Sequence, residues 1–223
     1  MNRLPSFLRQ HIAGLRLLIV FTIITGIIYP LALIGLSQAA FSGPANGSLI
    51  KFHGRIIGSS LLCQEFVNAK GNPLPQYFQP RPSAAILSGA PASDVGCDPR
   101  SSAASNFGPN NPTYIALIKM RQKQVSAFDH VPISKIPSDA VTASGSGLDP
   151  DISPQYAAIQ VNLVAATRHL PVATVQALVS KYTQGRTLGF LGEPRVNVLN
   201  LNLALDELPG QGVYAGGGAG TNS

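Results

Sequence analysis

Charged side chains are scarce in this sequence and tryptophan is absent: Asp, Glu, Lys and Arg make up 12% of its 223 residues. Nucleic-acid-binding surfaces usually carry a basic stripe with interleaved aromatic residues. The basic residues here are scattered apart from three arginines in the first 16 positions, so nucleic acid is not an expected partner. A surface with so few charges favours extensive contact with other protein. The 22 glycines and 18 prolines fit a loop-rich domain equally well.

Motifs for the common cofactor and metal sites are also missing. The sequence has no G-x-x-x-x-G-K-[ST] phosphate loop, no G-x-G-x-x-G opening a helix and no H-E-x-x-H. Its four histidines are dispersed along the chain, at His11, His53, His130 and His169. No metal site and no cofactor held by this chain are therefore predicted.

Acidic residues are absent before Glu65, whereas three arginines precede an uncharged apolar run at 17–41. A helix of about 25 residues spans roughly 37 Å, against a hydrocarbon core of about 30 Å. Basic residues that flank a spanning segment stay cytoplasmic. The pattern predicts a single-pass protein of the cell (inner) membrane. Residues 1–12 would be cytoplasmic, 13–41 would form a transmembrane helix in contact with lipid, and the rest would lie outside.

A cleavable signal peptide is the alternative for this run, because 37–39 (Ser-Gln-Ala) resembles a cleavage site. The hydrophobic region of a signal peptide is about 7–15 residues long, so the length favours a retained anchor. Pro30 predicts a kink, and Gly26 and Gly35 are small enough to let a partner helix approach closely. Small residues are also common in membrane helices that have no specific partner.

Two cysteines, Cys63 and Cys97, follow the anchor. An oxidising exterior permits a disulfide between them, but sequence alone leaves a bridge and two buried thiols as alternatives. Neither cysteine belongs to a C-x-x-C motif or lies next to a histidine, so neither a redox centre nor a zinc site is expected.

The chain beyond the anchor predicts one extracytoplasmic α+β domain at 42–208, mixing helices and strands, and a disordered Gly-rich tail at 209–223. One or two strands are expected within 49–66, and the proline-rich stretch 68–111 is expected to be loop. Asn-Pro at 111–112 and Ser-Pro at 153–154 are helix start signals. Helices are predicted at 112–128, from 154 to about 169, and at 171–182 with Gly185 ending the last. The alternating leucines of 195–206 predict a half-buried strand, whose last residues could turn helical.

Two short patterns are candidates for chemistry. Ser48 and Lys51 match the S-x-x-K nucleophile pattern of penicillin-interacting enzymes, but the S-D-N and K-T-G elements of those enzymes are missing. The second pattern is VTASGSGLDPDISP at 141–154, where the backbone N–H groups of 144–147 could form an anion-binding nest. No lysine follows these glycines, and a tight structural loop leading into the next helix explains the pattern as well.

The same stretch resembles the signature of the C subunit of the Kdp potassium-transporting ATPase family. Further segments resemble that family in the same order: ANGSLI at 45–50, Gly58-Ser59 with Gln64 and Phe66, Tyr-Phe at 77–78, Arg-Pro-Ser-Ala at 81–84, Ser-Asn at 105–106, Asn-Pro at 111–112, and Gly-Glu-Pro at 192–194 before VNVLNLNLALD. An ordered series over nearly the whole chain is far more specific than any single motif. The family pattern has glycine where this sequence has Cys63, which would indicate a positive φ or a close backbone approach there.

The resemblance implies a non-catalytic accessory subunit of a high-affinity, ATP-driven potassium uptake complex. Its expected partners are a channel-like potassium-binding subunit and a P-type ATPase subunit. The chain lacks the D-K-T-G phosphorylation sequence of P-type pumps. K⁺ would be the transported ion, and ATP would act through the complex. Members of the family are described as assembly and stabilising factors, and as catalytic chaperones that raise the ATP affinity of the pump subunit.

The resemblance points to a proposed nucleotide or coupling loop comprising Ser144, Ser146, Gly147, Leu148 and Asp149. The expected partner contacts are Arg81 and Ser83, from a segment that resembles the family, and the small anchor residues Gly26 and Gly35. Because the predicted topology puts the loop outside the cell, where ATP is scarce, coupling through the membrane helix is the expected route. The alternative functions are a membrane-anchored extracytoplasmic serine enzyme and a generic envelope scaffold.

Overall fold

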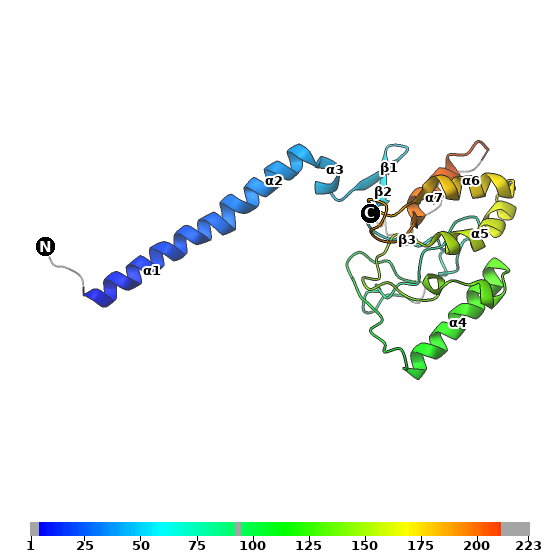
Figure 1. Ribbon diagram of the computed structural model, residues 1–223, viewed down its shortest axis with the longest axis horizontal. Helices are drawn as coiled ribbons and strands as arrows, with labels where there is room; N and C mark the ends of the chain where they lie inside the picture. The colour runs from blue at the N-terminus through cyan, green and yellow to red at the C-terminus, as the bar shows by residue number, and fades with distance from the viewer. Residues whose placement is uncertain (1–4, 92–94, 211–223) are drawn as a thin grey trace. The chain divides into compact units, whose positions relative to one another are not determined.

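A computed structural model describes residues 5–91 and 95–210 of the chain (Figure 1). The chain divides into two compact units, with the boundary between Leu49 and Ile50. The first unit is helical, and the second mixes helices and strands, in agreement with the fold class predicted from the sequence. Of the tail predicted to be disordered, residues 209–210 form a turn, and the remainder lies outside the described residues.

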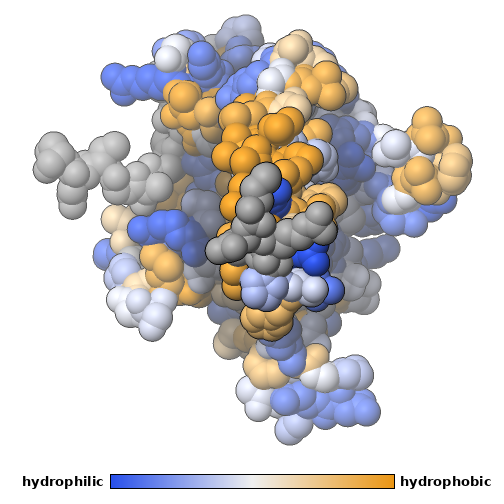
Figure 2. Space-filling view, turned by 90° about the vertical axis from the view of Figure 1, so that its left-hand side faces the viewer, coloured by the Kyte–Doolittle hydropathy of each residue, from blue (hydrophilic) through white to orange (hydrophobic). Residues whose placement is uncertain are grey.

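The first unit contains a long helix, Ser6–Ala40, of 35 residues, in which an 18-residue window has a mean hydropathy of 2.6; it is long and apolar enough to cross a membrane. Figure 2 looks along this helix from its N-terminal side and shows its hydrophobic side chains in orange. The helix consists of α1 (Ser6–Ile23), a π-helical turn (Ile24–Ile28) and α2 (Tyr29–Ala40). Pro30 has no N–H to bond a carbonyl in the preceding turn, and the π-helical turn lies where that bond is lost. The short helix α3 (Ser42–Ala45) follows.

The strands of the described chain form two small sheets. β1 (Leu49–Phe52) and β2 (Arg55–Ser59) pair with each other, which confirms the strands predicted within 49–66. β3 (Asp151–Ile152), β4 (Thr183–Gln184) and β5 (Arg195–Asn197) form an antiparallel sheet in the order β3-β5-β4. This second sheet joins the end of the 141–154 stretch to the C-terminal part of the chain.

Three predicted helices are confirmed: α4 (Pro112–Asp129), α5 (Pro154–Thr167) and α6 (Val172–Tyr182). The side chain of Asn111 accepts hydrogen bonds from the first N–H groups of α4, and that of Ser153 accepts one from Tyr156 at the start of α5. Each cap satisfies backbone donors that the helix itself leaves unpaired. Gly185 does not end α6, because the chain passes directly from the helix into β4. Single 3₁₀ turns lie at Ile133–Lys135 and Ser138–Ala140.

The strand predicted over 195–206 is wrong for most of its length. Only β5 is extended, and α7 (Val198–Asp206) follows it, capped by the side chain of Asn197. All residues of α7 except Asn200 are buried. A helix buried on every side needs no polar stripe, so its leucines can alternate with asparagine and alanine and imitate a strand.

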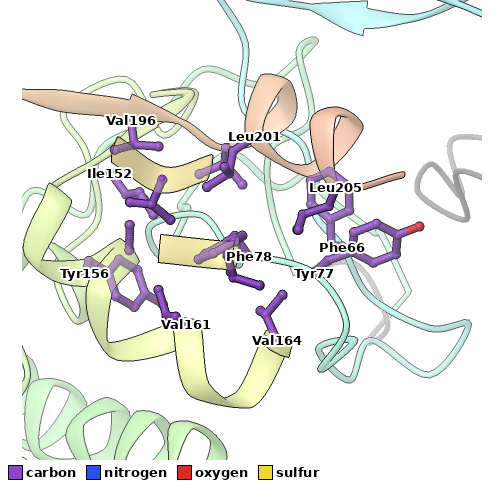
Figure 3. Close-up of a cluster of buried hydrophobic side chains, with 14 of the residues drawn as sticks. Phe66, Tyr77, Phe78, Ile152, Tyr156, Val161, Val164, Val196, Leu201 and Leu205 are labelled. Atoms are coloured by element: carbon purple, nitrogen blue, oxygen red, sulfur yellow. The ribbon is translucent and has the colours of Figure 1, made fainter. Parts of the chain in front are cut away.

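The core of the domain forms where α5, α6, α7 and the three-stranded sheet meet. Helix α5 packs against α6, and α6 packs against α7. Figure 3 shows Ile152, Val196, Leu201 and Leu205 around Phe78, with Phe66 and Tyr77 at one end of the cluster. Two of these aromatic side chains are fully buried: Phe78 comes from the proline-rich stretch, and Phe66 lies just before that stretch.

Buried polar side chains hold this irregular stretch at 76–79. The Asn202 amide accepts from the N–H of Phe78 at 2.8 Å and donates to its C=O at 2.9 Å. Gln160 does the same for Gln79, at 2.7 and 3.3 Å. The guanidinium of Arg168 donates to the C=O of residue 76 at 2.6 Å. We call these three side chains the backbone clamp: Gln160 of α5, Arg168 just after α5 and Asn202 of α7.

Candidate functional site

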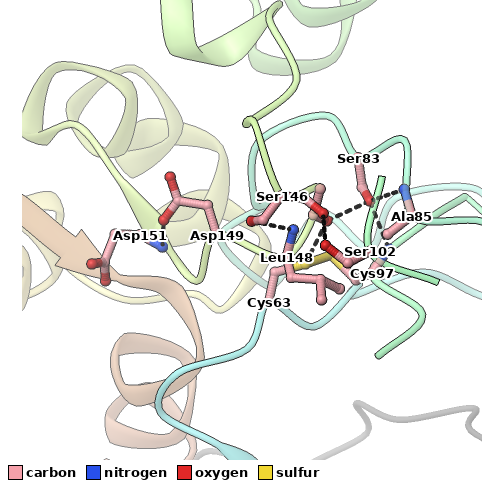
Figure 4. The surroundings of a disulfide bond; sticks show 10 residues. Cys63, Ser83, Ala85, Cys97, Ser102, Ser146, Leu148, Asp149 and Asp151 are labelled. Carbon is pink, nitrogen blue, oxygen red and sulfur yellow. Dashed lines mark hydrogen bonds between the residues drawn. A yellow bond between two sulfur atoms is a disulfide. The ribbon is translucent and has the colours of Figure 1, made fainter. Parts of the chain in front are cut away.

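The stretch 141–149, which we call the serine–glycine loop, is held in place by the segment that contains Ser83 (Figure 4). The Ser83 hydroxyl donates to the C=O of Gly147 at 2.6 Å and accepts from the N–H groups of Ala85 and Cys97, at 3.0 and 2.9 Å. Ser83 is buried. One hydroxyl group therefore joins three segments that are far apart in the sequence.

The carbonyl groups of the loop face other segments. The C=O of Ser146 accepts from the N–H of Ala103 at 2.9 Å and from the hydroxyl of Ser102 at 3.0 Å. The C=O of Leu148 accepts from the N–H of Cys63 at 3.0 Å. Together with the bond from Ser83 to Gly147, three successive carbonyls are fixed by partners outside the loop.

The N–H groups of the loop are partly used within it. The N–H of Gly147 donates to the C=O of Ser144 at 3.3 Å, and that of Leu148 donates to the hydroxyl of Ser146 at 3.1 Å. An anion nest requires successive N–H groups that point at the anion. The hydrogen bonding therefore favours a structural docking loop over a nucleotide cradle, the two interpretations that the sequence left open.

Gly147 is the loop position at which a side chain does not fit. Its φ is +70°, and a Cβ atom there would lie 2.5 Å from the C=O oxygen of Ala103 and 2.9 Å from the nitrogen of Ala85. Both are backbone atoms, so a flexible side chain cannot move away to make room. Gly145, two residues earlier, meets no heavy atom within 4 Å among the described residues and has no positive φ.

Cys63 and Cys97 form a disulfide beside this loop, with their Cα atoms 5.5 Å apart. Both side chains are buried. Cys63 does not have the positive φ that a glycine at its position would indicate; Cys97 does, with φ of 58°, next to Gly96 at 131°. The disulfide therefore links the segment that bonds Leu148 to the segment that bonds Ser83.

Ion pairs fix the acidic end of the loop. Arg81 donates to a carboxylate oxygen of Asp149 at 2.9 Å, and the other oxygen of Asp149 accepts from the N–H of Asp151. Asp151 in turn pairs with Arg195 at 3.1 Å and accepts from Asn197 at 3.3 Å. Burial raises the pKa of Asp151, Asp149 raises it further, and Arg195 opposes both. These carboxylates have protein partners rather than the open arrangement of a calcium loop.

The residues predicted for coupling and for partner contact occupy three kinds of position. Arg81 and Ser83, named as partner contacts, touch the serine–glycine loop itself. Within the loop, Ser146 is exposed and Ser144 is buried. Gly26 and Gly35 lie on the N-terminal helix, about two and a half turns apart, so they face different sides of it.

The S-x-x-K pattern does not form a helical site. Ser48 lies just before β1 with φ of 50°, and Lys51 is an exposed residue of β1. Since neither residue lies on a helix, no helical turn brings the two side chains onto one face. Among the described residues, no group of three or more His, Cys, Asp or Glu side chains is arranged to hold a metal ion.

A buried carboxyl group that sequence reasoning missed lies at the end of α4. Asp129 is buried, and its Oδ1 is one of two buried side-chain atoms of the described residues without a hydrogen-bond partner. Burial raises the pKa of Asp129 to about 7. Burial also raises the pKa of Tyr156 on α5, and Asp129 adds to that effect. Asp129 is the last residue of α4 and precedes the cap residue His130, and no feature of the local sequence predicts that its carboxyl group is buried.

Comparison with known proteins decides the family. The family model of the K⁺-transporting ATPase c chain, KdpC, matches residues 11–207. The chain belongs to the KdpC family. The match includes most of the N-terminal helix, the serine–glycine loop and the helices of the domain, and only the segment after residue 207 and the first 10 residues lie outside it.

Individual KdpC proteins are similar in sequence to this chain over most of their length. The potassium-transporting ATPase KdpC subunit of Gemmatimonas aurantiaca is 52% identical over 186 residues, which cover 83% of this chain and 86% of the relative. That of Streptomyces avermitilis is 47% identical over 220 residues (93% and 97%). That of Mycobacterium tuberculosis is 44% identical over 201 residues (90% and 99%). The family resemblance drawn from the sequence motifs is confirmed.

Replacement of Gly147 by alanine should destabilise the domain by about 2–4 kcal/mol, because the new Cβ meets backbone atoms and the positive φ disfavours it. Gly145→Ala is the matched control and should change the free energy of unfolding by less than about 0.5 kcal/mol. Urea unfolding of the full chain in detergent, followed by near-UV circular dichroism, measures both. Equal stability of the two variants would show that the loop is not packed as described.

The stability of the domain should fall as pH rises from about 4 to about 7, because folded Asp129 keeps a proton that the unfolded chain has lost. Asp129→Asn removes this group, so the variant should be more stable than the wild type at pH 8 and similar to it at pH 4. Melting temperatures across this range test the prediction. Parallel pH profiles for the two proteins would contradict it.

Proposed function

We infer that this chain is a non-catalytic accessory subunit of an ATP-driven potassium uptake complex, in which it promotes assembly and raises the ATP affinity of a P-type ATPase subunit. Membership of the KdpC family is the observation that carries this proposal. The helix Ser6–Ala40 supports it, because a helix of this length and hydropathy can hold the chain beside membrane-embedded partners.

The proposed topology places the N-terminus in the cytoplasm and the domain outside, in the cell (inner) membrane. Arg9 and Arg16 lie on the first half of the helix, and no acidic residue precedes Glu65, so the positive-inside rule assigns that end to the cytoplasm. The disulfide between Cys63 and Cys97 supports an oxidising compartment for the domain.

The proposed partners are a channel-like potassium-binding subunit and the P-type ATPase subunit, with K⁺ as the transported ion of the complex. The serine–glycine loop would act as a rigid contact or coupling surface rather than by holding ATP, since the carbonyls of residues 146–148 and the N–H groups of Gly147 and Leu148 already have protein partners. Arg81 is half-buried against the loop and would support the same surface. Gly26 and Gly35 would let helices of the partners approach from two sides.

A change in ATP affinity requires no contact between this chain and ATP. If the subunit binds one conformation of the pump more tightly than another, it shifts the pump toward that conformation. The affinity of the pump for ATP then changes by the ratio that linkage demands. The membrane helix, which carries a π-helical turn near its middle, is the element that reaches the cytoplasmic side in the proposed topology.

Cysteine labelling tests the topology. Lys123→Cys on exposed α4 should react with a membrane-impermeant maleimide in intact spheroplasts, whereas Ser6→Cys should react only after lysis. The two native cysteines are bridged and should not contribute. Labelling of the α4 variant only after lysis would reverse the proposed orientation.

Kinetics of the purified complex test the function. Membranes are solubilised gently, and the complex is purified through a tag on this chain to identify its companions. K⁺-stimulated ATP hydrolysis is then compared between complexes made with and without this chain, both purified through a tag on a partner subunit. Without it, the ATP concentration for half-maximal activity should rise about fivefold or more, the usual range of such couplings. Recovery of the chain without companions, or an unchanged ATP dependence, would contradict the proposal.

A further inference from the structure

A short hairpin, Arg186–Glu193, connects β4 to β5, and we call it the apolar hairpin. The N–H of Thr187 donates to the C=O of Leu191, and the N–H of Leu191 donates to the C=O of Thr187, each at 2.9 Å. The N–H of Phe190 also donates to the C=O of Thr187, at 3.3 Å. Arg186 pairs with Glu193 at 2.8 Å across its base. The hairpin therefore has a defined shape before it contacts anything.

The tip of the hairpin has a leucine, Leu188, in a backbone conformation that is strained for this residue type. Leu188 has φ of 56° and Gly189 has φ of 82°, the positive pair found at the two central positions of a type I′ turn. Asparagine, aspartate or glycine usually occupies the first of these positions, because a larger side chain is strained in left-handed backbone. A leucine here is an unfavourable choice for folding, and strain of this kind is typical of functional sites.

The tip also exposes three large apolar side chains. Leu188 is 79% exposed, Phe190 68% and Leu191 48%. None of the three belongs to the hydrophobic core cluster described above. Three large apolar side chains within four residues on a preformed turn are what a buried interface anchor requires.

A polar hollow of about 340 Å³ lies at the base of the hairpin. Gln184 and Arg195, which flank the hairpin and face each other across β4 and β5, both line it. Asp151, Asn197 and Asn200 add further hydrogen-bonding groups, and the rim includes Leu61, which is 59% exposed. An apolar projection beside a polar recess is the arrangement of a protein interface, with anchors surrounded by polar contacts.

The charges of the hairpin argue against a lipid surface as its partner. Its one cation, Arg186, is paired with its one anion, Glu193, and the residues between them are uncharged. Surface attachment to bilayers usually combines apolar residues with unpaired lysine or arginine that anionic headgroups attract. A polar hollow at the base of the hairpin would gain nothing from hydrocarbon.

We propose that the apolar hairpin inserts Leu188 and Phe190 into an apolar cleft on a companion subunit of the transport complex, while the hollow at its base receives hydrogen-bonding groups of that subunit. This inference rests on the proposed function, since it requires the complex to exist. The strained Leu188 is then explained: the residue serves the contact rather than the turn.

Leu188→Asn separates docking from folding. Asparagine suits a positive φ, so the melting temperature of the isolated chain should not fall, whereas the fraction of complex that co-purifies with the tagged chain should fall about tenfold, as for an interface anchor. Phe190→Ser should weaken the complex similarly. Met120→Ser on α4 removes an exposed apolar side chain elsewhere and should leave the complex intact.

The outcomes distinguish the inference from the function on which it rests. If the wild-type chain retains no companion subunits, the proposed function fails. If the wild type retains them and Leu188→Asn and Phe190→Ser do so equally well, or if Met120→Ser causes the same loss, only the hairpin inference is overturned. Phe190→Trp adds a unique fluorophore to a chain without tryptophan. Quenching of that fluorophore by brominated lipid, with the chain alone in nanodiscs, would assign the tip to the bilayer and overturn the inference.

Discussion

The backbone clamp is the interaction on which the domain depends. The stretch 76–79 has no helix or strand to satisfy its backbone, so Asn202 and Gln160 supply the missing hydrogen bonds from buried positions on two helices. Buried backbone groups left unpaired would each cost about 1–3 kcal/mol. By holding this stretch, the clamp sets the course of the chain through Arg81 and Ser83, which hold the serine–glycine loop.

The serine–glycine loop shows how a sequence rich in Ser and Gly can serve packing. The carbonyls of residues 146–148 accept hydrogen bonds from four residues outside the loop, the glycine at 147 fits where no side chain does, and a disulfide ties together the segments that hold the loop. Such a loop presents a surface whose shape is fixed by its own packing. That property agrees with the proposed coupling by linkage, in which the subunit acts on a pump by preferring one of its conformations.

Two features of this small domain favour contacts beyond itself. The apolar hairpin exposes side chains that a solitary domain would bury or replace, and it keeps a leucine in a backbone conformation that suits asparagine. The whole chain has only 12% charged residues. Low charge and exposed apolar anchors are properties of a subunit whose surface is completed by other proteins.

The sequence alone determined the long apolar helix, the capped starts of α4 and α5, and the family, because each is encoded by neighbouring residues: an uninterrupted run, an Asn-Pro or Ser-Pro pair, and an ordered series of motifs. Only the tertiary structure decided the identity of 198–206, which is helical because it is buried on every side. The surroundings of three further residues also depend on distant parts of the chain. Residues far away in the sequence bury Asp129 and pack against Gly147, whereas none of the described residues covers Leu188, and no local sequence pattern encodes these neighbours.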